Sequence, residues 1–301
     1  MLSFDFLLDR IEDEEENKKI KKLKTYVNKH FDQLEISHFE RLFEGIDDSL
    51  KGVFNLQYRM HPDINEVIKQ FYIEDGGLEC GLTTPIDLGV DDPDMNNPAS
   101  RYHGIEIDDL VSGNNHVIWI DTDSPELLDG TSRINYGEVE AIHDVLTKFR
   151  ESDSFNKYQK FWNNPEDQQI GLISFYGKQI RLLRNLRNKF NDISIRVSTV
   201  DRFQGMERNI IIVSMVRSNR IATDKNQKPD KVLFGELGFQ EQLDLGFAQS
   251  PNRLNVALSR AKRLLIIVGN SELFRQKKIY NSVYQTIASN PNGRIIKYET
   301  K

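Results

Sequence analysis

Apolar residues along the chain predict a helical segment first, and alternating strands and helices later. Between residues 5 and 50, leucine, isoleucine and phenylalanine recur at helical spacing among many charged residues, and no proline interrupts them. We therefore expect a charged helical lead-in over residues 1–50. Residues 75–115 are rich in glycine, proline, aspartate and asparagine, which predicts a long irregular insertion rather than a second domain.

Beyond the insertion, short apolar runs alternate with amphipathic stretches. Strands are expected at residues 117–120, 171–173, 210–216 and 264–269, and helices at 137–149, 178–190 and 251–261. The alternation predicts an α/β fold with a parallel sheet and helices on both faces, over residues 51–276, followed by a tail over 277–301. Ligands of such sheets bind in loops at the carboxyl ends of the strands, so we expect the functional residues there.

The composition is that of a globular protein without a membrane segment. The 301 residues are 38% hydrophobic and 29% charged, and the chain is long enough to bury a core. No run approaches the roughly 18 apolar residues of a membrane-spanning helix, and the N-terminus lacks a signal-peptide pattern. Cys80 is the single cysteine, which excludes a disulfide framework and a cysteine-based zinc site. We expect a cytoplasmic protein with no membrane partner.

A net charge of −6 argues at first against nucleic acid as a partner, but the charge is unevenly distributed. Between Lys178 and Arg208, eight basic residues stand against three acidic ones. The acidic excess lies elsewhere, notably in residues 12–16, a run that is typical of a solvated helix or chain end. The basic stretch keeps nucleic acid among the expected partners.

Four polar segments at the ends of the predicted strands carry the candidate chemistry: residues 56–62, 173–179, 197–207 and 252–262. In the third, hydroxyls and Gly205 suit close approach to phosphate oxygens, although a plain turn needs the same glycine. In the fourth, Arg253 and Arg260 share one helical face. A guanidinium there can neutralise a transferring phosphoryl group, although an ordinary surface helix would look the same.

The first segment is equally open to two interpretations. Tyr58 and Arg59 can provide a stacking ring and a phosphate contact, but a buried tyrosine beside a salt-bridged arginine has the same sequence. His61 before Pro62 favours a helix start over a metal ligand. The six histidines are scattered and no pair has metal-ligand spacing, so no metal site is predicted.

Taken together, in this order and spacing, the four segments resemble the motifs of the Upf1-like (Dna2/Nam7 group) helicases of superfamily 1, in their second RecA-like domain. The resemblance covers roughly residues 37–275. Residues 37–42 resemble the helix that leads into the first motif, and residues 132–138 resemble the Ser/Asn/Glu signature of a later helix. Phe175 departs from the pattern, because relatives usually carry proline before Tyr176.

The resemblance implies an ATP site and a nucleic-acid site. Tyr58 would stack on the adenine, Arg59 would reach the phosphates, and Glu207 would hydrogen-bond the ribose. Gly205 would approach the γ-phosphate through its backbone, and Arg260 would be the arginine finger. The catalytic roles would fall to Arg260 and Arg59. The residues implied to contact the nucleic-acid backbone are Ser174, Tyr176, Gln179, Ser198 and Thr199.

A helicase of this kind hydrolyses ATP between two RecA-like domains, and the sequence predicts only the second. The Walker A pattern, which holds the β- and γ-phosphates, is absent: residues 171–179 have another spacing, with Gln179 where serine or threonine binds Mg²⁺. Residues 117–121 look like a Walker B strand, but Thr122 follows where the family has a catalytic glutamate. We expect the chain to begin just after a first domain, and to bind ATP with Mg²⁺ weakly and hydrolyse it negligibly alone.

The sequence supports two candidate functions. The first is the C-terminal half of an ATP-dependent helicase or translocase that acts on single-stranded DNA or RNA. It would need a Walker A-bearing first RecA-like domain in the same or another chain. The second is a non-enzymatic module that binds single-stranded nucleic acid or docks onto another protein. The presence of Glu207 and Arg260 favours the first, because a remnant would tolerate their loss.

Overall fold

A computed structural model describes residues 13–29, 38–52, 54–74, 76–89, 100–129, 132–161, 169–222, 239–241 and 245–299. The chain divides into two compact units, Met1–Val53 and Phe54–Lys301. In the first unit, helices α2 (Glu14–Lys29) and α4 (His38–Gly45) and the short 3-10 helix η1 (Asp48–Leu50) are described. The predicted helical lead-in is therefore largely helical where it is described; residues 1–12 and 30–37 lie outside the described part.

A six-stranded sheet forms the centre of the second unit. Every neighbouring pair of its strands is parallel, so each strand must return through a crossover connection. This confirms the predicted α/β class. In spatial order the strands are β12 (Gly293–Tyr298), β3 (Val117–Thr122), β11 (Ala261–Gly269), β8 (Arg208–Ser214), β6 (Ile170–Ser174) and β7 (Ile195–Thr199).

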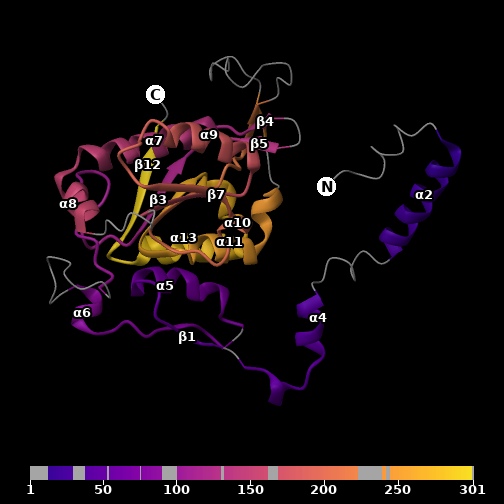
Figure 1. The fold of residues 1–301 in the computed structure, drawn as a ribbon, viewed down its shortest axis with the longest axis horizontal. Coiled ribbons are helices and arrows are strands. Elements are labelled where there is room, and N and C mark those ends of the chain that lie inside the picture. Colours follow the sequence, from indigo (N-terminus) through magenta and orange to yellow (C-terminus); the bar gives the residue numbers. More distant parts are fainter. Residues whose placement is uncertain are drawn as a thin grey trace. The chain divides into compact units, whose positions relative to one another are not determined.

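Side chains that alternate along the strands place one apolar layer on each face of the sheet. Along β3, Ile118 and Ile120 join the first layer, whereas Val117 and Trp119 join the second. A parallel sheet between two helical layers is the RecA-like arrangement that the motifs predicted (Figure 1). The first layer packs on α7 (Tyr136–Glu151), α8 (Asp153–Phe161) and α9 (Gly177–Arg187); the second packs on α5 (Pro62–Ile68), α10 (Val200–Phe203), α11 (Pro251–Leu258), α12 (Ser271–Phe274) and α13 (Lys278–Ser289).

Shorter elements border the sheet. The described part of residues 75–115 is mostly irregular, as predicted, apart from β2 (Glu79–Cys80), α6 (Pro85–Leu88) and an isolated bridge; residues 75 and 90–99 lie outside it. None of the described helices combines the length and the apolar character needed to cross a membrane. The remaining elements are β1 (Leu56–Gln57), η2 (Lys69–Phe71), β4 (Leu127–Asp129), β5 (Ser132–Ile134), β9 (Arg220–Ala222), β10 (Phe239–Glu241) and η4 (Gly246–Gln249).

Strand β7 was not among the strands predicted from the sequence, and it extends into the polar segment of residues 197–207. Its buried Ile195 and Val197 alternate with the exposed Arg196, which is the pattern of a strand at the edge of a sheet. The ends of two other elements also differ from the prediction. The strand expected over residues 210–216 ends at Ser214, and the helix expected to reach residue 261 ends at Leu258, because Ala261 already begins β11.

Residues 277–301, which were expected to be a tail, contain helix α13 and strand β12. Tyr280, Val283 and Ile287 of α13 are buried in the second layer, and β12 pairs with β3 along its whole length. In the sequence, β12 is marked by little more than Ile295 and Ile296 between charged neighbours. The sequence of β12 alone gives little indication of a strand, and its pairing with the largely buried β3 is what places it in the sheet.

We expect removal of residues 277–301 to unfold the second unit. The truncation removes β12 together with three side chains, Tyr280, Val283 and Ile287, that are at most 1% exposed. Burial of each contributes about 1.5–3 kcal/mol, so the loss is comparable to the roughly 5–15 kcal/mol that stabilises a whole domain. Urea unfolding followed by circular dichroism measures the effect, with a chain that ends at Glu299 as the control. A cooperative transition with an unchanged midpoint would show that the segment is dispensable.

Candidate functional site

Three of the four motif segments meet at the amino-terminal ends of β8 and β11. Glu207 directly precedes β8, and Arg260 directly precedes β11. Arg59, which follows β1, donates from Nε to Glu207 Oε2 at 2.7 Å and from Nη1 to the carbonyl oxygen of Ser259 at 3.3 Å. Residues that are far apart in the sequence therefore share one edge of the sheet.

Arg260 is held in place by uncharged acceptors. Its Nε donates to the carbonyl of Val256 at 2.9 Å, its Nη2 to Ser259 Oγ at 2.9 Å, and its Nη1 to the carbonyl of Met206 at 3.4 Å. No described carboxylate forms an ion pair with it. Burial, and then the nearby charge of Arg59, lower the pKa of Arg260. A half-buried guanidinium beside a second one favours the binding of an anion.

Glu207 balances part of this positive charge. Lys262 Nζ lies 2.5 Å from Glu207 Oε1, and Arg59 Nε lies 2.7 Å from Oε2. Burial alone would raise the pKa of Glu207, but the hydrogen bonds and charges of Lys262 and Arg59 hold it below its ordinary value. Lys262 stands in the fourth motif segment, but its spacing gave no reason to assign it a role.

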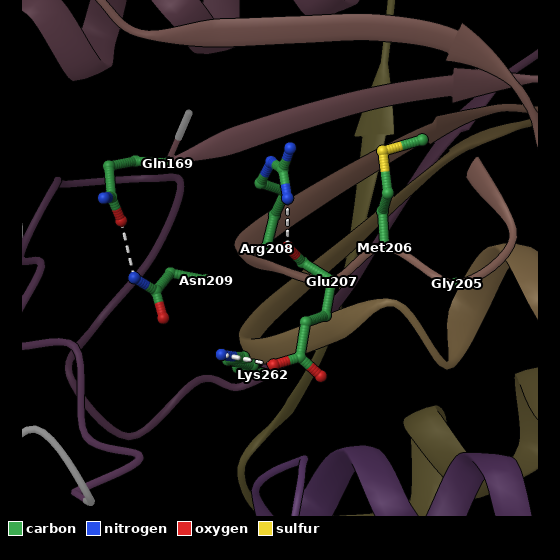
Figure 2. A pocket seen from close by; sticks show the side chains of 7 residues that line it. All are labelled: Gln169, Gly205, Met206, Glu207, Arg208, Asn209 and Lys262. Atoms are coloured by element: carbon green, nitrogen blue, oxygen red, sulfur yellow. Dashed lines mark hydrogen bonds and ion pairs between the residues drawn. The ribbon is translucent and has the colours of Figure 1, made fainter. Parts of the chain in front are cut away.

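A pocket of about 330 Å³ lies beside Glu207 and Lys262. Figure 2 shows the side chains that line it. Gly205, on its wall, has a φ of +82° and open space where a side chain would be, so its backbone is accessible. Tyr58, next to Arg59, is 60% exposed, and its ring covers Gly81 so closely that a side chain there would clash. The lining residues are Gln169, Gly205, Met206, Glu207, Arg208, Asn209 and Lys262.

This cluster of candidate residues lies at the amino-terminal edge of the sheet, whereas the sequence analysis expected the candidate residues at the carboxyl ends of the strands. Glu207 and Arg260 stand immediately before their strands, because the preceding helices α10 and α11 lead back to the amino-terminal edge. Arg260 lies in the turn after α11, and not on a helical face shared with Arg253. Arg253 instead donates from Nε to Asp201 Oδ1 at 3.2 Å.

The residues that the resemblance implied as nucleic-acid contacts lie toward the opposite, carboxyl-terminal edge, and most of them are buried. Four are at most 4% exposed, whereas Thr199 is partly exposed. Their side chains present almost no surface to a nucleic-acid strand, so direct contact would require another conformation. The four buried residues are Ser174, Tyr176, Gln179 and Ser198.

Gln179 belongs to a buried polar network that includes the 132–138 signature. Its Oε1 accepts from the N–H of Asn135, and its Nε2 donates to the carbonyl of Asn135 and to Ser214 Oγ, each at 3.0 Å. Glu138 Oε2 accepts from Ser214 Oγ at 2.6 Å. Burial raises the pKa of Glu138 to about 8 in spite of this bond, so its carboxyl group keeps its proton at neutral pH.

The network encloses a strained turn after β8. Val216 has a φ of +70°, which is rare for a β-branched residue, and the N–H of Arg217 donates to the carbonyl of Met215 at 2.9 Å. The N–H of Val216 donates to Glu138 at 2.7 Å, and its carbonyl accepts from Asn135 Nδ2 at 3.2 Å. Both backbone polar groups of Val216 therefore have partners. The turn explains why the predicted strand stops at Ser214.

The next residue, Arg217, forms a buried ion pair that the sequence did not indicate. Its Nε donates to Glu126 Oε2 at 2.7 Å, and Arg133 Nη1 donates to the other oxygen at 2.7 Å. The side chains of Arg217 and Glu126 are at most 2% exposed. Removing one partner of such a pair leaves an uncompensated buried charge, which makes the pair structurally important. No spacing rule connects two residues that are 91 positions apart.

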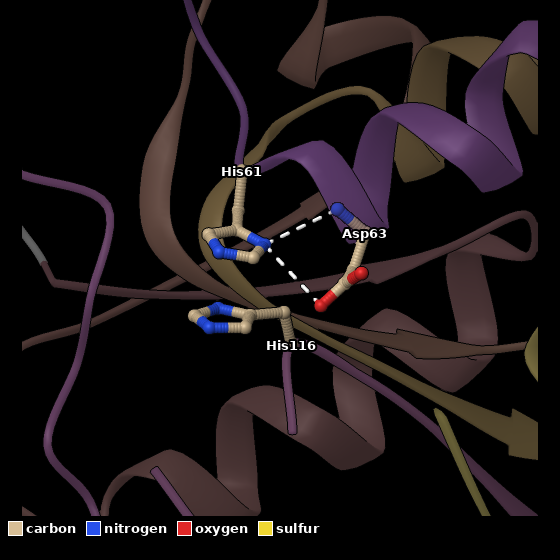
Figure 3. A group of neighbouring side chains, drawn as sticks. All are labelled: His61, Asp63 and His116. Carbon is tan, nitrogen blue, oxygen red and sulfur yellow. Dashed lines mark hydrogen bonds and ion pairs between the residues drawn. The ribbon is translucent and has the colours of Figure 1, made fainter. Parts of the chain in front are cut away.

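Three histidines that are scattered in the sequence also lie together. His61 caps α5, because its Nδ1 accepts from the N–H of Asp63 at 3.2 Å, and this confirms the predicted helix start. Its ring stacks on the ring of His116 with centroids 3.3 Å apart (Figure 3). The ring of His103 lies edge-on to His116. Burial, with the nearby His103, lowers the pKa of His61 to about 3, so its ring is neutral. The N–H of His61 donates to the carbonyl of Lys262, which attaches the first motif segment to β11.

His61, Asp63 and His116 bring possible metal-ligand atoms within 4.8 Å of one another. The lone pairs of an imidazole lie in the plane of its ring, so two rings stacked at 10° direct them side by side rather than toward one point. Both oxygens of Asp63 already accept hydrogen bonds, from Asn290 and Asn292. The group therefore fits a clamp on the start of α5 better than a metal centre.

Comparison with known proteins places these observations in a family. A family profile described as "AAA domain" matches residues 34–272. The DNA polymerase alpha-associated DNA helicase A of Saccharomyces cerevisiae is 30% identical over 81% of this chain and 31% of its own length. The DNA replication ATP-dependent helicase/nuclease dna2 of Schizosaccharomyces pombe is 29% identical over 86% of the chain and 16% of its own length.

The ATP-dependent helicase upf1 of Schizosaccharomyces pombe is 28% identical over 75% of the chain and 20% of its own length. The chain thus spans less than a third of each of these relatives. Their names confirm the resemblance to the Upf1-like group that the motifs indicated.

Replacing Glu138 with Gln is expected to flatten the pH dependence of stability. The pKa of Glu138 is about 8 in the folded state and about 4.5 in the unfolded state, so protonation of this carboxyl group stabilises the fold. The stabilisation is complete below about pH 4.5 and is lost as the pH rises through about 8. Glu138→Gln keeps the shape of the side chain and the acceptor for the N–H of Val216. Between pH 5 and pH 8, the free energy of unfolding of the variant should therefore rise relative to the wild type by about a few kcal/mol. Urea unfolding at several pH values measures this. Glu151→Gln, at the exposed end of the same helix, is the control, and parallel pH profiles for all three proteins would contradict the assignment.

Proposed function

The chain belongs to the AAA domain family and carries a helicase-like domain, and we propose that it is the second RecA-like half of an ATP-dependent helicase or translocase. In this proposal Arg260 is the arginine finger, and a first RecA-like domain, in the same or another chain, supplies the Walker A loop. The observation that carries the proposal is the meeting of Arg59, Glu207 and Arg260, from three distant segments, at one edge of the sheet.

ATP fits this edge because its phosphates require concentrated positive charge. Arg59, Arg260 and Lys262 lie together there, and Glu207 is the carboxylate among them. The exposed ring of Tyr58 would stack on the adenine, and Glu207 would hydrogen-bond the ribose. The open backbone of Gly205 would approach the γ-phosphate. The Mg²⁺ that accompanies ATP would be held by the phosphates and the first domain.

The guanidinium of Arg260 is prepared for a phosphate rather than free to rotate. Three hydrogen bonds use three of its five N–H groups, which leaves two for the oxygens of a transferring phosphoryl group. A donor that is already oriented needs little reorganisation when charge develops in the transition state. The 301 residues contain no Walker A loop, so this donor requires another domain to hold the nucleotide against it.

The second candidate function is a non-enzymatic module that binds single-stranded nucleic acid or docks onto another protein. The excess of basic residues between Lys178 and Arg208 favours it. This function needs neither ATP nor Arg260, whereas a motor needs both. Measurements of hydrolysis therefore separate the two candidates.

We expect the chain alone to show no measurable ATP hydrolysis, and addition of a Walker A-bearing first domain from a Upf1-like relative to restore it. In the restored complex, Arg260→Ala should lower kcat by roughly 10³- to 10⁵-fold, and Arg260→Lys should not rescue it, because lysine lacks the planar fork. Arg253→Ala is the matched control, since Asp201 already pairs with that guanidinium, and it should change kcat by only a few fold. Phosphate release with and without single-stranded DNA or RNA is the measurement.

Two results would contradict the proposal. Hydrolysis by the chain alone that is stimulated by a strand would reveal a phosphate-binding loop of another kind. Equal kcat values for wild type and Arg260→Ala in the active complex would exclude the arginine-finger role. Strand binding that is the same with and without Arg260, combined with no hydrolysis in any mixture, would instead support the non-enzymatic module.

A further inference from the structure

The irregular segment of residues 75–115 contacts the first motif segment from both of its described parts. In the first part, β2 pairs in parallel with β1, and the N–H of Gly81 donates to the last carbonyl of β1 at 2.8 Å. In the second part, Arg101 donates from Nε to the carbonyl of Arg59 at 2.6 Å and from Nη2 to the carbonyl of Tyr58 at 3.1 Å. Nothing in the sequence assigned a role to this segment.

A single guanidinium, that of Arg101, thus holds two successive carbonyls of the motif. The amide groups of the same turn also depend on a side chain, because the N–H groups of Arg59 and Met60 both donate to Gln57 Oε1, at 2.8 and 2.9 Å. Residues 58–60 belong to no helix or strand, so these side chains satisfy the backbone where a ladder of backbone bonds would otherwise do so. The orientation of the turn therefore depends on them.

The position of Arg101 is in turn fixed by β11. Arg263 donates from Nη1 to the carbonyl of Ser100 and to that of Tyr102, the latter at 3.0 Å. The side chain of Arg263, a residue of β11, is buried and only 1% exposed. The contacts therefore connect the start of β11, which lies beside the candidate site, to the carbonyls of the motif.

Gly81 supports the ring of Tyr58. A side chain at Gly81 would overlap three carbons of that ring, so the ring rests directly against the backbone there. Tyr58 is nevertheless 60% exposed. An aromatic ring that is supported on one side and open to solvent elsewhere can accept a base with little loss of conformational freedom.

We propose that Arg101 and Gly81 are positioning residues for the nucleotide, which hold the ring of Tyr58 and the guanidinium of Arg59 in the orientation that ATP requires. The inference rests on the proposed ATP-binding function and deepens it. Neither residue touches the ligand in this role, because each acts through the motif. The irregular segment, which lies outside the four motif segments, thereby takes part in nucleotide binding.

Direct binding of a phosphate is the other role that the charge of Arg101 would permit. Burial lowers the pKa of Arg101, and the nearby charge of Glu207 opposes this effect, so Arg101 lies within electrostatic reach of the site. Its Nε and Nη2 are nevertheless directed at backbone carbonyls. The two roles are separable by experiment, because only positioning changes the motif in the absence of a ligand.

Gly81→Ala tests the support of the Tyr58 ring without changing any charge. In the complex of the full chain with a Walker A-bearing first domain, we expect the KM for ATP to rise roughly 10-fold, because stacking on an aromatic ring contributes about that factor. The kcat should stay within about twofold, since the ring binds the ground state and the transition state alike. Gly52→Ala is the matched control, because open space surrounds that position, and it should keep the wild-type KM. A wild-type KM for Gly81→Ala would overturn the role of Gly81.

Arg101→Ala tests the hold on the motif in the full chain without nucleotide. Hydrogen–deuterium exchange of the Arg59 and Met60 amides, followed by mass spectrometry, should become roughly 5- to 10-fold faster, because lost hydrogen bonds ease local opening of the turn. In the active complex the same variant should lower kcat/KM by roughly 10²-fold, as expected for displaced ligand-binding groups. Arg150→Ala is the matched control, because Arg150 also donates to a backbone carbonyl, that of Lys189 at 3.3 Å, but stands on α7. It should leave both quantities unchanged.

The outcomes distinguish this inference from the proposed function. Wild-type exchange in Arg101→Ala would overturn the positioning role, and a raised KM would then identify Arg101 as a phosphate-binding charge. Faster exchange throughout the chain, rather than in the motif alone, would show a general structural role and overturn it as well. Faster exchange in the motif, with no hydrolysis by any complex, would overturn the proposed function and leave Arg101 as a clamp without a nucleotide to position.

Discussion

The hydrogen bond from the N–H of Arg208 to the carbonyl of Arg260, at 2.9 Å, fixes the candidate site. It is the first link of the parallel ladder between β8 and β11, and it joins the backbones of the two segments that carry Glu207 and Arg260. Because all six strands are parallel, residues that precede a strand meet at one edge of the sheet and residues that follow a strand meet at the other. The parallel pairing therefore places Glu207 and Arg260 at the amino-terminal edge of the sheet, and Ser174 and Thr199 at the carboxyl-terminal edge.

At the amino-terminal edge, the decisive property is an incomplete balance of charge. Glu207 accepts from Arg59 and Lys262 at the same time, and Arg260 is left with neutral acceptors. A completed ion-pair network would be stable but closed to a ligand, whereas oriented cations with spare donors remain able to bind phosphate. The stacked His61 and His116 contribute indirectly, because His61 attaches the Arg59 segment to the first residues of β11.

At the carboxyl-terminal edge, most residues of the motif segments are buried in the interior. Asn135, Glu138 and Gln179 satisfy the polar groups around the turn at Val216, whose left-handed backbone would otherwise be too costly to maintain. Gly246 contributes to the same region, since a side chain there would collide with Arg217 and Tyr176.

The sequence by itself determined the fold class, the four motif segments and the family. Apolar periodicity and the order of motifs depend on residues that are close together in the sequence, so they can be recognised without the structure. It also predicted the cap at His61, since a proline after the cap position acts locally. Only the tertiary structure decided which edge of the sheet each motif occupies, that β12 completes the sheet, and that Glu126 pairs with Arg217. These features depend on contacts between residues that are distant in the sequence, and no spacing along the chain encodes them. Burial is decided in the same way: Gln179 and Thr199 look alike as polar motif residues, and only packing places one inside and leaves the other accessible.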